Sequence, residues 1–243
     1  MPFKLTYKPF GERAILVEWP QNIDENILKD ILVFKTKING KNIEQILEVK
    51  NAYNSLLIIY KSICRNFKNE VDLLKECYQN PYLDTDILSN TWRIPVCYDD
   101  KFGLDLELIS KEKSISKTNI IKRHSHAIYT VYFIGFLPGF LYLGGLDNAL
   151  HIPRKSTPRL HIKKGSVAIG GNQTGVYPNA SPGGWNIIGN SPVNFFDISK
   201  EKPCFAKAGD QIQFYSVSLK EYQNIKTLVD ANVYQLESEV IDD

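Results

Sequence analysis

The sequence has little of several features that would classify a protein at once. Only four of its 243 residues are cysteine, and these match neither a CxxC pair nor a dense disulfide framework: Cys64, Cys77, Cys97 and Cys204. No stretch approaches the ~18 apolar residues of a membrane span. The first residues, MPFKLTYKPFGER, lack the apolar run of a secretory signal. The sequence therefore predicts a soluble, cytoplasmic protein with reduced cysteines and no membrane partner.

An excess of charge of one sign is also missing. The chain has 29 lysines and arginines against 27 aspartates and glutamates, a formal net charge of +2. Non-specific binding to nucleic acid depends on a strongly basic surface that neutralises many phosphates, so we expect no nucleic-acid partner. The composition, 43% hydrophobic and 23% charged, is typical of a folded globular protein and excludes global disorder.

The N-terminal part of the chain alternates strand-like and helix-like runs. The pattern predicts strands at 13–19, 43–49 and 56–60, a helix that begins after Asp24, and a second helix over 67–78. Another strand, beyond this βαββα order, would complete a ferredoxin-like α+β domain. We therefore assign residues 1–90 to such a domain and the polar, proline-containing stretch 80–90 to a linker.

The composition changes in the second part of the chain. Eleven of the 15 glycines fall between residues 135 and 189, and short strand-like runs lie between them. Short strands separated by glycine and proline turns favour a β-barrel or a sandwich over a helical domain. We assign this β domain to residues 91–220 and treat 221–243 as an acidic C-terminal tail whose end, ESEVIDD, is frayed.

A glycine- and aromatic-rich segment, GFLPGFLYLGG at 135–145, is the largest local signal. Glycines allow a shaped loop, and the aromatic residues between them can wall a pocket, so Phe136, Pro138 and Gly139 are candidate substrate-binding residues. The alternative is a tight corner of a barrel with aromatic side chains in its core. The segment matches neither a Walker A loop nor the GxGxxG fingerprint.

A basic segment follows at 151–164, HIPRKSTPRLHIKK, with five lysines and arginines and no acidic residue. Arginine binds a carboxylate or phosphate through two parallel hydrogen bonds. Arg154 and Arg159 are therefore candidate ligands for an acidic small molecule or an acidic partner surface. A solvated basic loop is the alternative.

Other polar side chains extend the list of candidates. His124 could serve as a general base or as a polar pocket wall, whereas the histidines, cysteines and acidic residues match no metal-binding pattern, so we expect no metal. Gln173, Thr174 and Tyr177 lie in or beside glycine-rich turns, where such groups can hydrogen-bond a neutral amide. The absence of a GxSxG elbow or a catalytic cysteine signature makes a covalent triad mechanism a poor fit.

Long motifs in this chain resemble the KipI/PxpB family, also called allophanate hydrolase subunit 1. They are IPVCYDDKFGLDL (94–106), FIGFLPGFLYLGGL (133–146), PRKSTPRLHIKKGSVAIGGNQTGVYP (153–178) and SPGGWNIIGNSPVNFFD (181–197). The resemblance covers roughly residues 8–217 and implies a ferredoxin-like domain followed by a cyclophilin-like β-barrel. It also implies the B subunit of an ATP-dependent 5-oxoprolinase, which opens 5-oxoproline (pyroglutamate) to glutamate together with separate A and C subunits.

The resemblance gives the candidate residues provisional roles. Arg154 or Arg159 would hold the substrate carboxylate, Gln173, Thr174 or Tyr177 would contact the lactam, and His124 and Gln173 are the candidate catalytic residues. ATP would be handled mainly by another subunit or across the interface, with the C subunit as the direct neighbour, so the chain alone should be inactive. The alternatives are an inhibitor of a sensor histidine kinase, a component of an allophanate- or urea-hydrolysing complex, and, by fold analogy alone, a prolyl isomerase.

Overall fold

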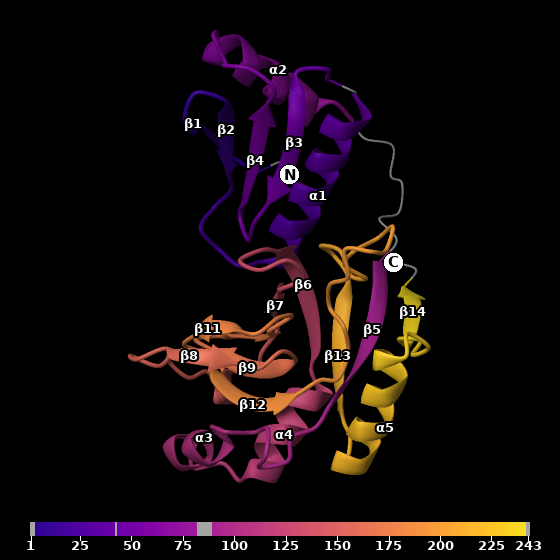
Figure 1. The fold of residues 1–243 in the computed structure, drawn as a ribbon. Helices are drawn as coiled ribbons and strands as arrows, with labels where there is room; N and C mark the ends of the chain where they lie inside the picture. Colours follow the sequence, from indigo (N-terminus) through magenta and orange to yellow (C-terminus); the bar gives the residue numbers. More distant parts are fainter. Residues whose placement is uncertain (1–2, 42, 82–88, 242–243) are drawn as a thin grey trace. The chain divides into compact units, whose positions relative to one another are not determined.

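The computed structural model describes residues 3–41, 43–81 and 89–241 (Figure 1). The chain divides into two compact units, residues 1–87 and 88–243. Most of the expected linker at 80–90 lies outside the described residues. No helix in the described residues is long and apolar enough to cross a membrane.

The N-terminal unit is an antiparallel sheet with two helices. Its elements are β1 (Thr6–Pro9), β2 (Ala14–Glu18), α1 (Glu25–Gly40), β3 (Ile46–Asn51), β4 (Ser55–Tyr60) and α2 (Phe67–Gln79). The strands lie in the order β1-β2-β4-β3, and α1 contacts α2, β3 and β4. Within residues 3–81, the strand that brings this sheet to four is therefore β1, which lies at its edge as the antiparallel neighbour of β2.

Local sequence explains where α1 begins and which face it buries. The Asp24 side chain accepts hydrogen bonds from the backbone N–H groups of Asn26 and Ile27, which confirms the predicted N-cap. The apolar residues of α1 recur at helical spacing and are buried in the core of the unit. They pack with Leu56 and Ile58 of β4, whose side chains are fully buried. Amphipathic spacing and a single cap thus position the helix.

The C-terminal unit contains most of the strands. Its elements are β5 (Ser89–Val96), α3 (Leu106–Lys113), α4 (Lys117–His126), β6 (Ile128–Ile134), β7 (Leu141–Gly144), the 3-10 helix η1 (Asn148–Leu150), β8 (Arg159–Ile162), β9 (Ser166–Gly170), β10 (Gln173–Val176), β11 (Ser181–Gly183), β12 (Asn186–Asn190), β13 (Gln211–Ser216), α5 (Leu219–Asp230) and β14 (Ser238–Ile241). Eight strands form one sheet in the order β12-β9-β10-β7-β6-β13-β5-β14, and β8 pairs with β11 in a separate ribbon. Figure 1 shows α3 and α4 together at one end of these strands.

This large sheet is open rather than a closed barrel. Its edges are β12 and β14 in the part of the chain that the structure describes. One isolated antiparallel bridge pairs Cys97, just after β5, with Asn190 at the end of β12. Mixed α and β structure is therefore confirmed, whereas continuous strand pairing does not close the sheet as a barrel requires.

The C-terminal segment forms a helix and a strand. Ser218 accepts a hydrogen bond from the backbone N–H of Glu221, and the Glu221 carboxylate accepts one from the backbone N–H of Ser218, which makes a capping box at the start of α5. Strand β14 then pairs with β5, with Ser238 opposite Trp92. The prediction of a frayed end over ESEVIDD is therefore wrong for Ser238–Ile241, because this segment pairs with β5.

Candidate functional site

The predicted catalytic histidine is a buried link between three parts of the C-terminal unit. His124, near the end of α4, is fully buried. Its Nδ1 lies 2.7 Å from the hydroxyl of Tyr98, and its Nε2 lies 2.8 Å from Thr174 Oγ1. The Thr174 hydroxyl donates to the backbone carbonyl of Ala168 at 3.0 Å. Because that carbonyl can only accept, Thr174 Oγ1 accepts from His124 Nε2–H, and Nδ1 accepts from the hydroxyl of Tyr98.

This arrangement leaves no nitrogen of His124 open to a substrate. Burial lowers the pKa of the imidazole to about 3, so the ring is neutral at physiological pH. A general base needs hydrogen-bond reach to the proton it removes. The geometry therefore gives His124 a structural position, and the same holds for Thr174, which is also fully buried.

One of the two candidate arginines already has a carboxylate. The guanidinium of Arg159, on β8, donates two hydrogen bonds of 2.8 Å to the buried carboxylate of Asp105. Lys155 Nζ lies 2.9 Å from the same group, and the backbone N–H of Ile187 donates to it at 2.7 Å. Burial alone would raise the pKa of Asp105, but the hydrogen bonds from Arg159, Lys155 and Ile187 outweigh it and hold the pKa below its usual value.

The other candidate arginine is free of such a partner. The guanidinium of Arg154 lies 5.5 Å from the centre of the Trp185 ring and is exposed to solvent. No carboxylate of the described residues forms an ion pair with it. Its chain neighbours are fixed, since the side-chain amide of Asn186 donates to the carbonyl of Pro153 at 3.0 Å and the N–H of Lys155 donates to the carbonyl of Gly184 at 2.7 Å. Arg154 is therefore an anchored, available cation on an aromatic face.

The glycine- and aromatic-rich segment supplies part of that face. Phe140 packs against Trp185 and Tyr177, with ring centres 5.5 and 5.6 Å apart, and against Phe136 at 5.8 Å. Phe136 is 66% exposed, and its backbone has φ of +66°, which is uncommon for a residue other than glycine. Gly139, in the same loop, is buried and has φ of +81°. The segment is thus both a tight corner and an aromatic wall.

The remaining predicted residues differ in their exposure. Pro138 is exposed on the loop, Gln173 is half-buried at the start of β10, and Tyr177 is buried among the aromatic residues. Burial raises the pKa of Tyr177, and the nearby charge of Arg154 opposes that rise. The structure thus brings Arg154, Tyr177 and Phe136 to one aromatic cluster through Phe140 and Trp185, while Arg159 is bound to Asp105.

A hollow of about 480 Å³ opens beside Arg154. Its lining includes Leu108 and Glu112 of α3, Ile152, Arg154, Ser156 and Thr157. Asp105, Glu112 and Asn186 were not among the residues expected from the sequence. For Asp105 a signal existed, since it lies within the 94–106 motif. Nothing in the sequence indicated that Glu112 and Arg154 would line the same hollow.

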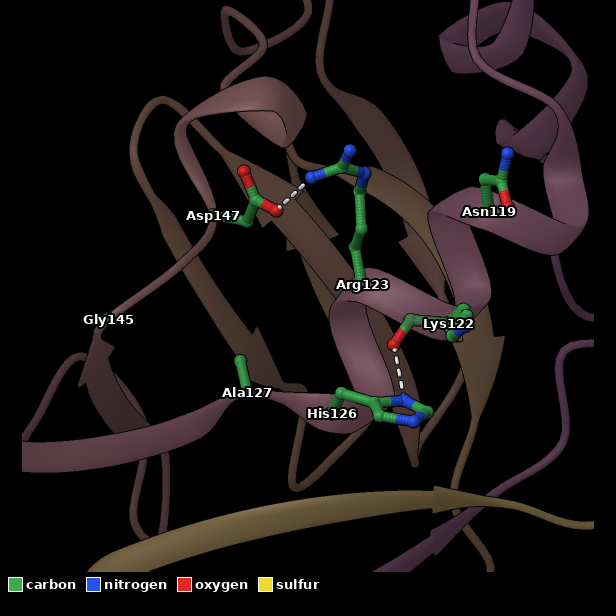
Figure 2. Close-up of a pocket in the computed structure, with 7 residues that line it drawn as sticks. All are labelled: Asn119, Lys122, Arg123, His126, Ala127, Gly145 and Asp147. Atoms are coloured by element: carbon green, nitrogen blue, oxygen red, sulfur yellow. Dashed lines mark hydrogen bonds and ion pairs between the residues drawn. The ribbon is translucent and has the colours of Figure 1, made fainter.

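A second hollow, of about 510 Å³, lies at the end of α4 (Figure 2). Figure 2 shows Arg123 pointing to Asp147, with which it forms an ion pair, and the His126 ring bonded to the carbonyl of Lys122 at 2.8 Å. The Asp147 carboxylate also accepts from the backbone N–H of Ala149 at the start of η1. These side chains already have partners, so the hollow beside Arg154 is the stronger candidate.

Comparison with known proteins places the chain in a family. The family model described as the carboxyltransferase domain, subdomain C and D, matches residues 5–206. The chain belongs to this family. The 5-oxoprolinase B subunit of Bacillus subtilis (strain 168) is 31% identical over 236 residues, covering 93% of this chain and 98% of that protein. The protein of the same name from Haemophilus influenzae (strain ATCC 51907 / DSM 11121 / KW20 / Rd) is 36% identical over 206 residues, covering 85% and 95%. These matches confirm the resemblance to the KipI/PxpB family.

A solved structure supports the fold. The crystal structure of the Kluyveromyces lactis urea carboxylase matches 98% of this chain with a TM-score of 0.82, at 22% identity, and the match spans 24% of that longer chain. At this identity the likeness concerns the fold alone. In the urea carboxylase, a unit of this fold is therefore one part of a longer chain.

Proposed function

We propose that the chain is the B subunit of an ATP-dependent 5-oxoprolinase, a cytoplasmic complex that opens 5-oxoproline to glutamate. The Bacillus subtilis and Haemophilus influenzae relatives, both named as B subunits of 5-oxoprolinase, match it over nearly their whole length. The structural observation that supports this function best is the Arg154 guanidinium, which is anchored on an aromatic face and has no carboxylate partner in the described chain. The substrate is a small carboxylate with an uncharged ring amide, and this surface suits both parts.

The residues divide the work as follows in this proposal. Arg154 binds the substrate carboxylate, and Trp185 with the exposed Phe136 covers the apolar carbons of the ring. Gln173, half-buried at the start of β10, hydrogen-bonds the lactam and is the candidate catalytic residue of this chain. Arg159 and Thr174 act indirectly, because each holds another residue of the unit in place.

Partner proteins complete the enzyme in this proposal. The sequence has no recognised phosphate-binding motif, so we assign ATP to the assembled complex, with the A and C subunits as partners and the C subunit in direct contact. The fused arrangement of the urea carboxylase, in which this fold is one segment of a longer chain, supports such a partnership. We also assign the units to ferredoxin-like and cyclophilin-like types. The strand order of the first and the bridge in the second between Cys97, just after β5, and Asn190 of the edge strand β12 support that assignment.

Omission of single components tests the function. The chain is co-expressed with the A and C subunits, and ATP hydrolysis that depends on 5-oxoproline is measured with each protein left out in turn. We expect activity only from the complete set. Activity that persists without this chain would refute the proposal. A complete set that hydrolyses ATP with allophanate or urea, but not with 5-oxoproline, would move the chain to an amide-hydrolysing complex. Absence of all activity, together with tight binding to a sensor histidine kinase, would favour the inhibitor.

A further inference from the structure

Two opposite charges without ion-pair partners line the hollow beside Arg154. Glu112 extends from the last turn of α3, and Arg154 extends from the loop before β8. Within the described chain neither forms an ion pair, with the other or with a third residue. Glu107, on the same helix, contrasts with this, because it is bound to Lys111 at 3.4 Å and Lys117 at 3.2 Å. The hollow therefore presents one available cation and one available anion.

The neighbouring charges do not cancel this pair. Lys155 also lines the hollow, but its ammonium is bound to Asp105. The rest of the lining is uncharged, with apolar carbon from Leu108 and Ile152 and hydroxyl groups from Ser156 and Thr157. A ligand that fits this lining has a carboxylate and an ammonium close together, and a further polar group that can accept hydrogen bonds from Ser156 and Thr157.

We propose that this hollow binds a free α-amino acid as its zwitterion, with the carboxylate at Arg154 and the ammonium at Glu112. Resting on the proposed function, the amino acid is the glutamate that the reaction forms. The ring nitrogen of 5-oxoproline is an uncharged amide, whereas ring opening turns it into an ammonium. Glu112 therefore meets a charge that only the product has. It acts as a residue that distinguishes product from substrate, and it strengthens product inhibition.

Binding measurements on the full chain and on the assembled complex test the site. L-glutamate, 5-oxoproline and glutarate, which lacks the ammonium, are titrated by calorimetry against the wild type, Glu112→Gln and the control Glu107→Gln. We expect wild type to bind L-glutamate more tightly than glutarate. We also expect Glu112→Gln to lower the ratio of L-glutamate to 5-oxoproline affinity by roughly threefold to tenfold, since the two charges are solvent-exposed. Glu107→Gln should leave the ratio as it is.

Three results would overturn the site: no binding of L-glutamate to either preparation, equal binding of glutarate and L-glutamate, or an unchanged ratio in Glu112→Gln. These results are separate from the fate of the proposed function. If the complete set of proteins fails to act on 5-oxoproline, yet Glu112→Gln still weakens amino-acid binding, the proposed function falls and the zwitterion site stands. If 5-oxoproline is hydrolysed and Glu112→Gln leaves the ratio of L-glutamate to 5-oxoproline affinity unchanged, the zwitterion site is refuted and the proposed function stands.

Discussion

The Nε2 atom of His124 donates a hydrogen bond to Thr174 Oγ1 across 2.8 Å, inside a fully buried part of the C-terminal unit. The Tyr98 hydroxyl donates to the other nitrogen of His124, and the Thr174 hydroxyl donates to the Ala168 carbonyl, so these hydrogen bonds form one continuous chain of donors and acceptors. The chain ties α4 to β10 and β9. Since Gln173 directly precedes Thr174, this network also fixes the start of the strand that presents the candidate catalytic amide.

The buried histidine makes stability depend on pH. Its pKa is about 3 in the folded chain, against an ordinary value of 6.5, so between these values the unfolded chain binds a proton that the folded chain does not. The stabilisation is complete above pH 6.5 and is lost as the pH falls towards 3. We expect the free energy of unfolding of wild type to fall by about 2 kcal/mol more than that of His124→Gln between pH 7 and pH 5.

Urea unfolding of both proteins at the two pH values measures this difference, which removes the contribution of all other titrating groups. Should His124→Gln fail to fold, the ring resonances of His124 in wild type report the same property by NMR. They should stay those of the neutral Nε2–H tautomer down to pH 4. A titration of His124 near pH 6.5 would contradict the buried network.

Alanine substitutions of the two arginines in the basic segment should have different effects on stability and on substrate binding. Arg154 is exposed and unpaired, so Arg154→Ala should leave the melting temperature within about 2 °C of wild type. In the assembled complex it should raise the KM for 5-oxoproline roughly tenfold, because a charged hydrogen bond to the substrate is lost. Arg159→Ala removes a bidentate partner of a buried carboxylate and should cost about 2 kcal/mol of stability. Equal effects of both variants on KM and on stability would contradict this division.

The sequence was informative about local structure and about which segments matter. The Asp24 cap and the buried face of α1 could be predicted, because caps and helical periodicity depend on residues that are close in the sequence. The hydrogen-bond and ion-pair partners of the candidate side chains could not be predicted from the sequence. Arg154 and Arg159 have the same side chain, and each directly follows a proline. Only the tertiary structure places Asp105 against one of them. His124 is similar, since its burial depends on Tyr98 and Thr174, which are distant in sequence. The open edges of the large sheet could not be predicted either, because strand-like runs do not reveal how strands pair.

The Asp105 carboxylate should be a main support of the basic segment. Asp105→Asn keeps the size of the side chain but leaves Arg159 and Lys155 without a negative partner, and we expect a loss of about 3 kcal/mol in the free energy of unfolding at pH 7. Because its pKa is held below the usual value of 3.8, the stabilisation is present above that pH and is lost as the pH falls through the folded pKa. Chemical unfolding at pH 7 measures the loss. The control is Asp100→Asn, which removes an exposed partner of Lys117, and an equal loss there would contradict the expected role.

The tight corner beneath the aromatic wall can be separated into backbone strain and steric clash. Gly139 and Gly171 both have positive φ, +81° and +69°, so alanine at either site forces an L residue into a conformation that costs roughly 1 kcal/mol. At Gly171 no atom lies within 4 Å of the new Cβ, whereas at Gly139 that Cβ would lie 2.7 Å from the Cβ of Phe196 and 2.8 Å from the Phe195 carbonyl oxygen. We therefore expect Gly139→Ala to lower the free energy of unfolding by at least about 2 kcal/mol more than Gly171→Ala, as measured by urea unfolding. The clash can be relieved only by moving Phe195 and Phe196 or the loop that holds Phe136, so Gly139→Ala should also raise the KM for 5-oxoproline in the assembled complex. If the two variants were equally stable, the close approach at Gly139 would have no energetic weight, and its position in the motif would have to reflect direct contact with substrate.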